Sequence, residues 1–369
     1  MHLSVISAAR ILVFKMNRTI LIMAGGTGGH IYPGLAVADA LHEQGWKVVW
    51  LGAPNSMEAD LVPKHGYPVA WVNFTGVRGK GILRLITLPF TLLRALGQSA
   101  DAIFRYRPDV VLGMGGYITM PGGLMAALLR RPLVIHEQNS IAGMSNKILA
   151  IIATRVLSGF PGVLKNTLWC GNPVRADIAS LAEPQVRYGA RSGKLNVLVV
   201  GGSLGAQALN EALPNALAKL REQERPSVIH QTGKKHFESV QQLYAQAGVE
   251  ADVRPFLDDM ANQYAKADLV ICRAGALTIA ELAAAGVASM LIPFPFAVDD
   301  HQSGNARFLS DQGAAVLLPQ KELSAETLTQ LLREMNRGKL LRMAQAARKL
   351  AKPEATQVVV SVCQELAEA

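Results

Sequence analysis

Short apolar runs rich in β-branched residues alternate along the chain with longer stretches of helical spacing. These runs lie at residues 19–23, 48–51, 110–112, 133–136, 196–200, 228–231, 269–272 and 289–292. Strands separated by helices pair in parallel, because the chain crosses back over the sheet between them. The pattern therefore predicts an α/β protein built on doubly wound parallel sheets.

The same succession of elements opens each half of the chain. A strand at residues 19–23 leads through a glycine cluster to a helix at 33–44, and a strand at 196–200 leads through a second cluster to a helix at 206–220. This succession is typical of the first βα unit of a Rossmann-like domain. Two such domains facing each other would bring the carboxyl ends of both sheets to a shared cleft.

The polar, turn-rich stretch at residues 171–193 is the candidate linker between the halves. We place the boundary at Arg175, with a first domain at residues 1–175 and a second at 176–352. Residues 1–17 are interpreted as an extension without the features of a signal peptide. A length of 369 residues also favours two domains, because it exceeds what one core usually supports.

Composition narrows the class of protein. Half of the residues are hydrophobic and 18% are charged, which excludes a disordered chain. The net charge of +9 favours phosphate-bearing ligands, nucleic acid or an anionic membrane surface. Cys170, Cys272 and Cys363 have no CxxC spacing, so they predict neither disulfides nor a zinc site. No apolar run reaches the ~20 residues of a spanning helix, and membrane contact is expected to be peripheral.

Three glycine clusters follow predicted strands: AGGTGGH at 24–30, GMGGY at 113–117 and GGSLGA at 201–206. Such clusters let backbone N–H groups approach a phosphate at the positive end of a helix. One cluster alone is equally consistent with a tight turn, whereas three favour nucleotide binding. NAD is disfavoured, because the second strand of each half ends, at 50–52 and 231–233, without an acidic residue for the ribose.

Residues 272–281 indicate a strand end, a glycine turn and a new helix. Its first amides, at 276–278, would face a diphosphate, and Glu281 could accept hydrogen bonds from ribose hydroxyls. Helix stabilisation explains Glu281 equally well. The following loop, DDHQ at 299–302, has no Asp-X-Asp pattern, so we expect direct sugar contacts and no required metal.

In the first half, His30 closes the glycine cluster and opens a helix, whose dipole favours the neutral imidazole that can take a proton. A capping or packing role is an equally good explanation. The polar run HEQN follows the strand at 133–136. Glu137 and Asn139 are candidate substrate contacts, whereas His136 is expected to be buried.

The segment at residues 81–96 is apolar nearly all round, and we interpret it as lying on an anionic bilayer. Basic residues lie in it or beside it: Arg78, Lys80, Arg84 and Arg94. The side chains expected to insert are Ile82, Leu85, Ile86, Leu88, Phe90, Leu92 and Leu93. The alternative is a buried core helix with a kink at Pro89.

Eight motifs resemble those of the MurG family, the UDP-N-acetylglucosamine transferases of peptidoglycan synthesis. They are GGTGGH, GMGGY, HEQN, GNPVR, GGSLGA, FLDDM, RAGALTIAE and DDHQ, in that order. The resemblance implies a GT-B fold and an inverting transfer of GlcNAc from UDP-GlcNAc to the C4 hydroxyl of the muramyl sugar of lipid I, which gives lipid II. It also implies that the final helix, at about 353–369, packs back on the first domain.

The resemblance also implies roles for single residues. Contacts to the donor fall on Arg175, Ser203, Leu257 through its backbone, Ala276, Leu277, Thr278, Ile279, Ala280, Glu281 and Gln302. Contacts from the first domain fall on Thr27, Gly28, Gly29 and Asn139. His30 is the first candidate for the general base and Glu137 the second. The chain departs from the family at His301 and Leu257, where glutamine and isoleucine are frequent.

The expected partners are UDP-GlcNAc, lipid I (undecaprenyl-diphosphate-MurNAc-pentapeptide), an anionic membrane surface and other cell-wall synthesis proteins, without nucleic acid. No cofactor is expected. The implied location is the cytoplasmic side of the inner membrane, and the implied process is cell-wall biogenesis, on which cell shape and division depend. Two alternatives remain: a UDP-GlcNAc 2-epimerase, which needs no membrane surface, and a non-catalytic membrane subunit, which needs no second nucleotide-binding domain.

Overall fold

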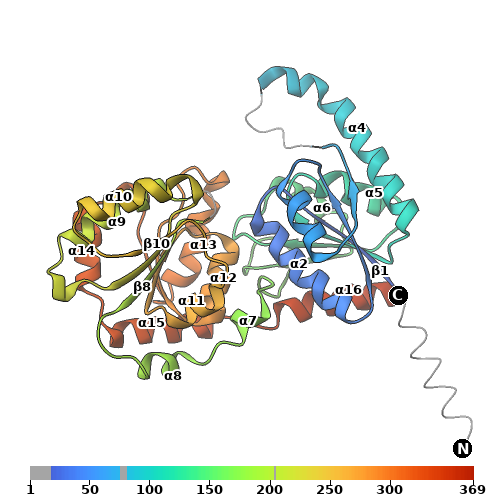
Figure 1. Cartoon of the computed structure of the whole chain (residues 1–369). Helices are drawn as coiled ribbons and strands as arrows, with labels where there is room; N and C mark the ends of the chain where they lie inside the picture. Colours follow the sequence, from blue (N-terminus) through green and yellow to red (C-terminus); the bar gives the residue numbers. More distant parts are fainter. Residues whose placement is uncertain (1–17, 75–80, 203–204) are drawn as a thin grey trace, which may run out of the picture. The chain divides into compact units, whose positions relative to one another are not determined.

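The computed structural model describes the backbone of residues 18–74, 81–202 and 205–369, and their side chains except those of 81–86 and 298. The chain folds into two compact units (Figure 1). Unit 1 comprises the described residues up to Pro173 together with Glu354–Ala369, and unit 2 comprises Val174–Pro353.

Unit 1 is built on a seven-stranded parallel sheet with the order β3-β2-β1-β4-β5-β6-β7. Its strands are β1 (Thr19–Ala24), β2 (Lys47–Gly52), β3 (Val69–Trp71), β4 (Val110–Gly115), β5 (Leu133–Glu137), β6 (Arg155–Ser158) and β7 (Leu168–Trp169). Its helices are α2 (Gly28–Glu43), α3 (Met57–Leu61), η1 (Val62–His65), α4 (Gly81–Tyr106), α5 (Thr119–Leu128), α6 (Met144–Leu149) and α16 (Ala355–Glu368). All six residues of β1 are buried, as expected for a central strand with both faces covered.

Unit 2 has a six-stranded parallel sheet with the order β10-β9-β8-β11-β12-β13. Its strands are β8 (Asn196–Val200), β9 (Ser227–Gln231), β10 (Asp252–Arg254), β11 (Leu269–Cys272), β12 (Ala288–Leu291) and β13 (Ala315–Leu317). Its helices are α7 (Ala176–Ala179), α8 (Pro184–Gly189), α9 (Gln207–Ala218), α10 (Phe237–Gln246), α11 (Met260–Lys266), α12 (Ala276–Ala285), α13 (His301–Ser310), α14 (Ala325–Arg333) and α15 (Arg337–Lys349). Short 3₁₀ turns are η2 (Glu222–Glu224), η3 (Lys234–His236), η4 (Val298–Asp300) and η5 (Gln320–Glu322).

Both sheets reverse their strand succession beside their first strand. In unit 1 β1 lies between β2 and β4, and in unit 2 β8 lies between β9 and β11. Doubly wound sheets bind ligands at the carboxyl ends of the strands at this switch point. The predicted doubly wound class is therefore confirmed, and each unit has one expected ligand-binding edge.

The last helix belongs to unit 1 although it follows unit 2 in the sequence. Helix α16 packs against α2 (Figure 1). Its buried side chains join the core on that face of the sheet: Val359, Val360, Cys363 and Leu366. The chain therefore passes from unit 1 to unit 2 and back.

The predicted linker at 171–193 is wrong for its second part, which is built into unit 2. Arg187 donates hydrogen bonds to the carbonyl oxygens of Ala285 and Gly286, at the negative end of α12. Arg191 pairs with the buried carboxylate of Asp268 at 2.7 Å. The polar composition suggested a linker, but here the charged side chains satisfy buried acceptors.

Helix α4 continues to Tyr106, ten residues beyond the segment interpreted as membrane-binding. Leu88 and Leu92 pack against the core of unit 1, so their predicted insertion into a bilayer is wrong. Phe90 and Leu93 are 74% and 66% exposed. Helical spacing places Leu88 and Leu92 on one face of α4 and Phe90 and Leu93 on the other. The core interpretation therefore describes the first face, and the membrane interpretation describes the second. Arg78 and Lys80 lie outside the described residues, as do the side chains of 81–86.

Candidate functional site

Two glycine loops touch at the switch point of unit 1. They lie at the carboxyl ends of β1 and β4, and Gly115 and Gly116 have φ values of 98° and 88°. A Cβ atom on Gly116 would lie 2.2 Å from the carbonyl oxygen of Gly25. Only glycine allows this backbone approach, which explains the GMGGY cluster without a ligand.

The first glycine loop is partly occupied by a carboxylate. Glu58 is buried, and its side chain accepts hydrogen bonds of 3.2 Å from the amides of Gly26 and Ala53. This carboxylate lies where a phosphate cradle was expected, so the amide of Gly26 is not available to a phosphate. Sequence analysis missed Glu58, because an isolated acidic residue in a short helix gives no signal of burial.

Helix α2 begins at Gly28, five residues before the predicted start at residue 33. The glycine cluster suggested a loop, but His30 and Ile31 already donate to the carbonyl of Thr27 at 3.1 and 3.3 Å. Thr27 and the first-turn residues Gly28 and Gly29 thus form the positive end of α2. His30 lies in that turn and is partly exposed.

His30 is connected to the end of β5 by a chain of hydrogen bonds. Its Nδ1 lies 2.8 Å from Oε1 of Gln138, and Nε2 of Gln138 lies 3.0 Å from Nδ1 of His136. Nε2 of His136 lies 2.9 Å from the carbonyl oxygen of Gly171. Burial lowers the pKa of His136 to about 4, so this imidazole is neutral. The expectation that His136 is buried is confirmed.

Glu137 organises the loop after β5. Its Oε1 accepts from the amide of Asn139 at 2.9 Å, and its Oε2 accepts from the amide of Gly143 and from Nδ2 of Asn146, at 3.0 and 2.9 Å. The side chain of Glu137 is buried, whereas Asn139 is partly exposed. These contacts make Glu137 an anchor for the loop that carries Asn139, which weighs against a role as base.

Buried neutral histidines make stability depend on pH. His230 in unit 2 lies between Tyr244 and Asn210, and burial lowers its pKa to about 3. Both His136 and His230 therefore have folded-state pKa values below the unfolded value of ~6.5, and the unfolded chain binds more protons between these values. The stability that these neutral histidines contribute above pH 6.5 is lost as the pH falls from there toward their folded-state pKa values.

We expect the free energy of unfolding to drop by about 2 kcal/mol per histidine between pH 7 and 5, measured by urea denaturation. The variant His230→Gln should make this dependence less steep, because only one of the two buried histidines then remains. An equally steep dependence in His230→Gln would contradict the assignment.

At the switch point of unit 2, Gly275 is the N-cap residue of α12. It has no side chain, so the first turn of this helix has no side-chain cap hydrogen bond. Leu277 and Thr278 are partly exposed, whereas Ala276 is 6% exposed. Ile279 is buried and its amide donates to Gly275, so its side chain serves packing. The partly exposed Ala280 lies beside it.

Glu281 lies one turn into α12 with its carboxylate held at both oxygens. Oε1 lies 3.4 Å from Nη2 of Arg175, and Oε2 accepts from the hydroxyl of Tyr264 at 3.0 Å. Burial raises the pKa of Glu281, while Arg175 and Tyr264 oppose the shift. Arg175 and Glu281, predicted from separate motifs, therefore meet. Tyr264 was missed, because nothing in its sequence context marks it.

The loop between β12 and α13 is held by side chains on both sides. Gln302 accepts a 2.9 Å hydrogen bond from the amide of Phe294, which leaves its Nε2 group to donate. Arg273 donates to the carbonyl of Ile292 at 3.1 Å. Asp299 and Asp300 have φ values of 53° and 51°, a conformation that is costly for residues other than glycine. Strain of this kind is frequent at functional loops.

Two further predicted residues are less informative. The side chain of Leu257 is 4% exposed, which is compatible with contact through its backbone alone. Ser203 lies outside the described residues.

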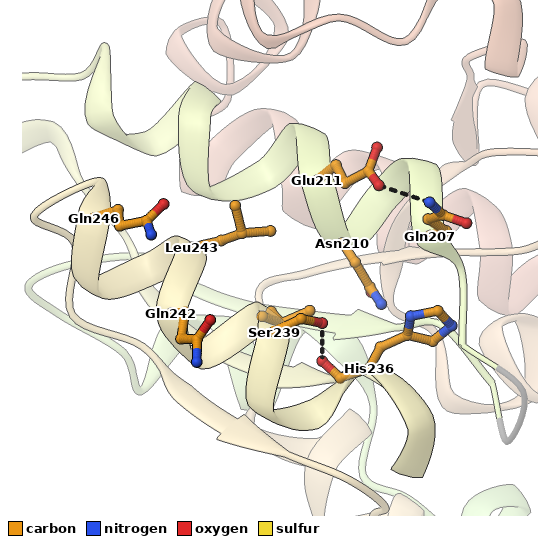
Figure 2. Close-up of a pocket in the computed structure, with 9 residues that line it drawn as sticks. Gln207, Asn210, Glu211, His236, Ser239, Gln242, Leu243 and Gln246 are labelled. Atoms are coloured by element: carbon orange, nitrogen blue, oxygen red, sulfur yellow. Dashed lines mark hydrogen bonds between the residues drawn. The ribbon is translucent and has the colours of Figure 1, made fainter.

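A groove with a volume of about 510 Å³ lies between α9 and α10 (Figure 2). Most of the residues that line it are polar, and they include His236 and the hydrogen-bonded pair Gln207 and Glu211. None of the residues that line it is a predicted site residue. The groove therefore shares no lining residue with the candidate site at the start of α12.

Comparison with known families first defines the class. The chain matches the glycosyltransferase family 28 N-terminal domain over residues 20–158 and the C-terminal domain of that family over residues 196–359. Together with two doubly wound parallel sheets, these matches define a glycosyltransferase of the GT-B fold class.

Individual relatives refine this class. The chain is 60% identical over 350 residues to the UDP-N-acetylglucosamine--N-acetylmuramyl-(pentapeptide) pyrophosphoryl-undecaprenol N-acetylglucosamine transferase of Aromatoleum aromaticum, covering 95% of this chain and 98% of the relative. The protein of the same name from Azoarcus sp. (strain BH72) is 61% identical over 351 residues, which are 95% of this chain and 99% of the relative. The crystal structure of MurG from Acinetobacter baumannii superposes with a TM-score of 0.83 at 44% identity. The match covers 94% of this chain and 99% of that chain. The chain belongs to glycosyltransferase family 28, in its MurG family.

Proposed function

We propose that this protein transfers GlcNAc from UDP-GlcNAc to the C4 hydroxyl of MurNAc in undecaprenyl-diphosphate-linked lipid I, which forms lipid II with inversion at the anomeric carbon. The observation that carries this proposal is the 60% identity, over nearly the full length of both chains, to a transferase whose name describes these substrates. An epimerase would share the donor but would need no acceptor.

Unit 2 is the proposed donor-binding domain. The positive end of α12 is suited to the UDP diphosphate, and Glu281 to the two ribose hydroxyls, because a carboxylate accepts hydrogen bonds at both oxygens. Arg175 pairs with Glu281 in this structure and is 41% exposed, so it can also contact the nucleotide. Gln302 has its amide group left to donate to the sugar.

Unit 1 is the proposed acceptor domain. His30, at the start of α2, is the base that takes the proton of the C4 hydroxyl as that oxygen attacks the anomeric carbon. The bond from the anomeric carbon to the UDP oxygen breaks, and amides of α12 with Arg175 stabilise the charge on UDP. Asn139 and the first-turn amides of α2 contact the sugars. The loop 299–302 supports direct sugar contacts, so the proposal includes no metal.

Product analysis tests the proposed chemistry. Incubation with UDP-GlcNAc and a lipid I analogue should give a disaccharide joined at C4 of MurNAc, with the anomeric configuration opposite to that of the donor sugar. Mass spectrometry and NMR of the purified product give the linkage and the configuration. A retained configuration, or consumption of UDP-GlcNAc without acceptor, would contradict the proposal.

We further propose that unit 1 binds peripherally to the cytoplasmic face of the inner membrane. Among the described residues no helix is long and apolar enough to cross a bilayer. Helices α4, α5 and α6 pack in sequence against one another, and α4, the end of α5 and the turn after α6 expose large apolar side chains. These are Phe90, Leu93, Leu128, Ile151 and Ile152. Exposed Arg94, Arg130 and Lys147 supply positive charge for anionic head groups.

The double variant Phe90→Ser, Leu93→Ser should bind anionic vesicles at least about tenfold more weakly, since burying each side chain contributes ~1.5–3 kcal/mol. Sedimentation with vesicles measures binding. Activity should fall on long-chain lipid I and stay unchanged on a short-chain acceptor. The control Val186→Ser removes a 65% exposed side chain of unit 2. Unchanged vesicle binding in the double variant would refute this membrane surface.

A further inference from the structure

The hydrogen bonds between His30 and Gly171 determine where each proton lies. A backbone carbonyl only accepts, so Nε2 of His136 carries a proton at its 2.9 Å contact with Gly171. His136 is neutral, so its Nδ1 is an acceptor. Nε2 of Gln138 lies 3.0 Å from that nitrogen and 3.1 Å from the carbonyl oxygen of His136, two acceptors that require the amide's NH₂ group.

The orientation of Gln138 then determines the tautomer of His30. With its NH₂ group directed at His136, Gln138 presents Oε1 to Nδ1 of His30 at 2.8 Å. An amide oxygen cannot donate, so Nδ1 of His30 must carry the proton. In the neutral imidazole the unprotonated nitrogen is therefore Nε2.

We propose that Gln138 is a positioning residue that holds His30 in the Nδ1–H tautomer. Nε2 of His30 is then the atom that receives the proton of the sugar's C4 hydroxyl. This inference rests on the proposed function for its catalytic meaning, while the tautomer itself can be measured without turnover. The series starts at the backbone carbonyl of Gly171, which can only accept and so places a proton on Nε2 of His136. Each donor and acceptor assignment thus fixes the next one, from Gly171 through His136 and Gln138 to His30.

Gly115 gives this arrangement its space. A Cβ atom on Gly115 would lie 2.8 Å from Nδ1 of His30 and 3.3 Å from Oε1 of Gln138, the two atoms of the hydrogen bond. Its φ of 98° also favours glycine. The second glycine cluster, predicted as a phosphate loop, thus leaves room for the base and its partner.

The direct test is the ¹⁵N NMR spectrum of histidine-labelled full-length protein at a pH where His30 is neutral. The shifts of the two ring nitrogens distinguish the protonated from the unprotonated one, and loss of signals in His30→Asn assigns them. We expect Nδ1 of His30 to be protonated. An Nε2–H tautomer in the wild-type protein would overturn the inference.

Two variants test the positioning role. Gln138→Met keeps the approximate volume but not the hydrogen bonds, so we expect mixed tautomers and a kcat about 2- to 10-fold lower, the weight of one neutral hydrogen bond. The KM for UDP-GlcNAc should not change, because the proposed donor site lies in unit 2. Wild-type tautomer and kcat in Gln138→Met would also overturn the inference.

Gly115→Ala should displace His30 and lower kcat further than Gly45→Ala. The control shares a positive φ, 86°, but has nothing within 4 Å of the added Cβ. Equal kcat values in these two folded variants would count against the inference, and thermal melting verifies that each variant folds. A wild-type protein without transferase activity would instead overturn the proposed function, whatever tautomer the spectrum shows.

Discussion

The variant His30→Ala is expected to have a kcat at least ~10²-fold lower than the wild type, because general-base catalysis typically contributes 10²- to 10⁴-fold. The hydroxyl that attacks the anomeric carbon would lose its proton acceptor. His30 belongs to unit 1, so calorimetry should give an unchanged affinity for UDP-GlcNAc. Initial rates at saturating donor and acceptor give kcat.

The control for this prediction is His65→Ala, which removes an exposed histidine of the same unit. It should keep wild-type kcat. An unchanged kcat in His30→Ala would eliminate His30 as the base. Glu137 would then be the remaining candidate, although its carboxylate already accepts hydrogen bonds from Asn139, Gly143 and Asn146.

The variant Glu281→Ala is expected to raise the KM for UDP-GlcNAc by about 10- to 150-fold. This range corresponds to ~1.5–3 kcal/mol for hydrogen bonds to a charged group. Oε1 and Oε2 of Glu281 are positioned by Arg175 and Tyr264, so the carboxylate is already oriented before the nucleotide binds. Steady-state kinetics with varied donor measure the change.

A donor with a 2′-deoxyribose separates ribose binding from helix stabilisation. The wild type should bind this analogue more weakly than UDP-GlcNAc, whereas Glu281→Ala should bind both alike, since the shared interaction is already lost. Glu281→Gln retains the side-chain volume and should fall between the two proteins. If Glu281→Ala still discriminated fully between the donors, Glu281 would act only through the stability of α12.

Much of the fold follows from the sequence because the central strands are buried on both faces. The eight predicted runs all contain strands, since continuous apolar segments bounded by turns are a strong signal. The strands that were not predicted, β3, β6, β7, β10 and β13, have two to four residues each. Their hydrophobic pattern is too short to distinguish them from loops.

The candidate site was predicted residue by residue but not as a network. HEQN gave four polar residues after a strand, yet spacing cannot show that Gln138 reaches His30, 108 residues earlier in the chain. Nor can it show that Glu58 occupies the amide of Gly26. Composition was misleading at Arg187 and Arg191, which lie in the polar, turn-rich stretch interpreted as a linker. Such contacts depend on tertiary packing, which local pattern does not encode.

The central claim is that donor cleavage is coupled to a lipid-linked acceptor. The most direct measurement is the release of UDP from UDP-GlcNAc, followed with and without a lipid I analogue. We predict one UDP released for each acceptor glycosylated, and almost none when the acceptor is left out. UDP release that is independent of the acceptor, or no release in its presence, would contradict the account.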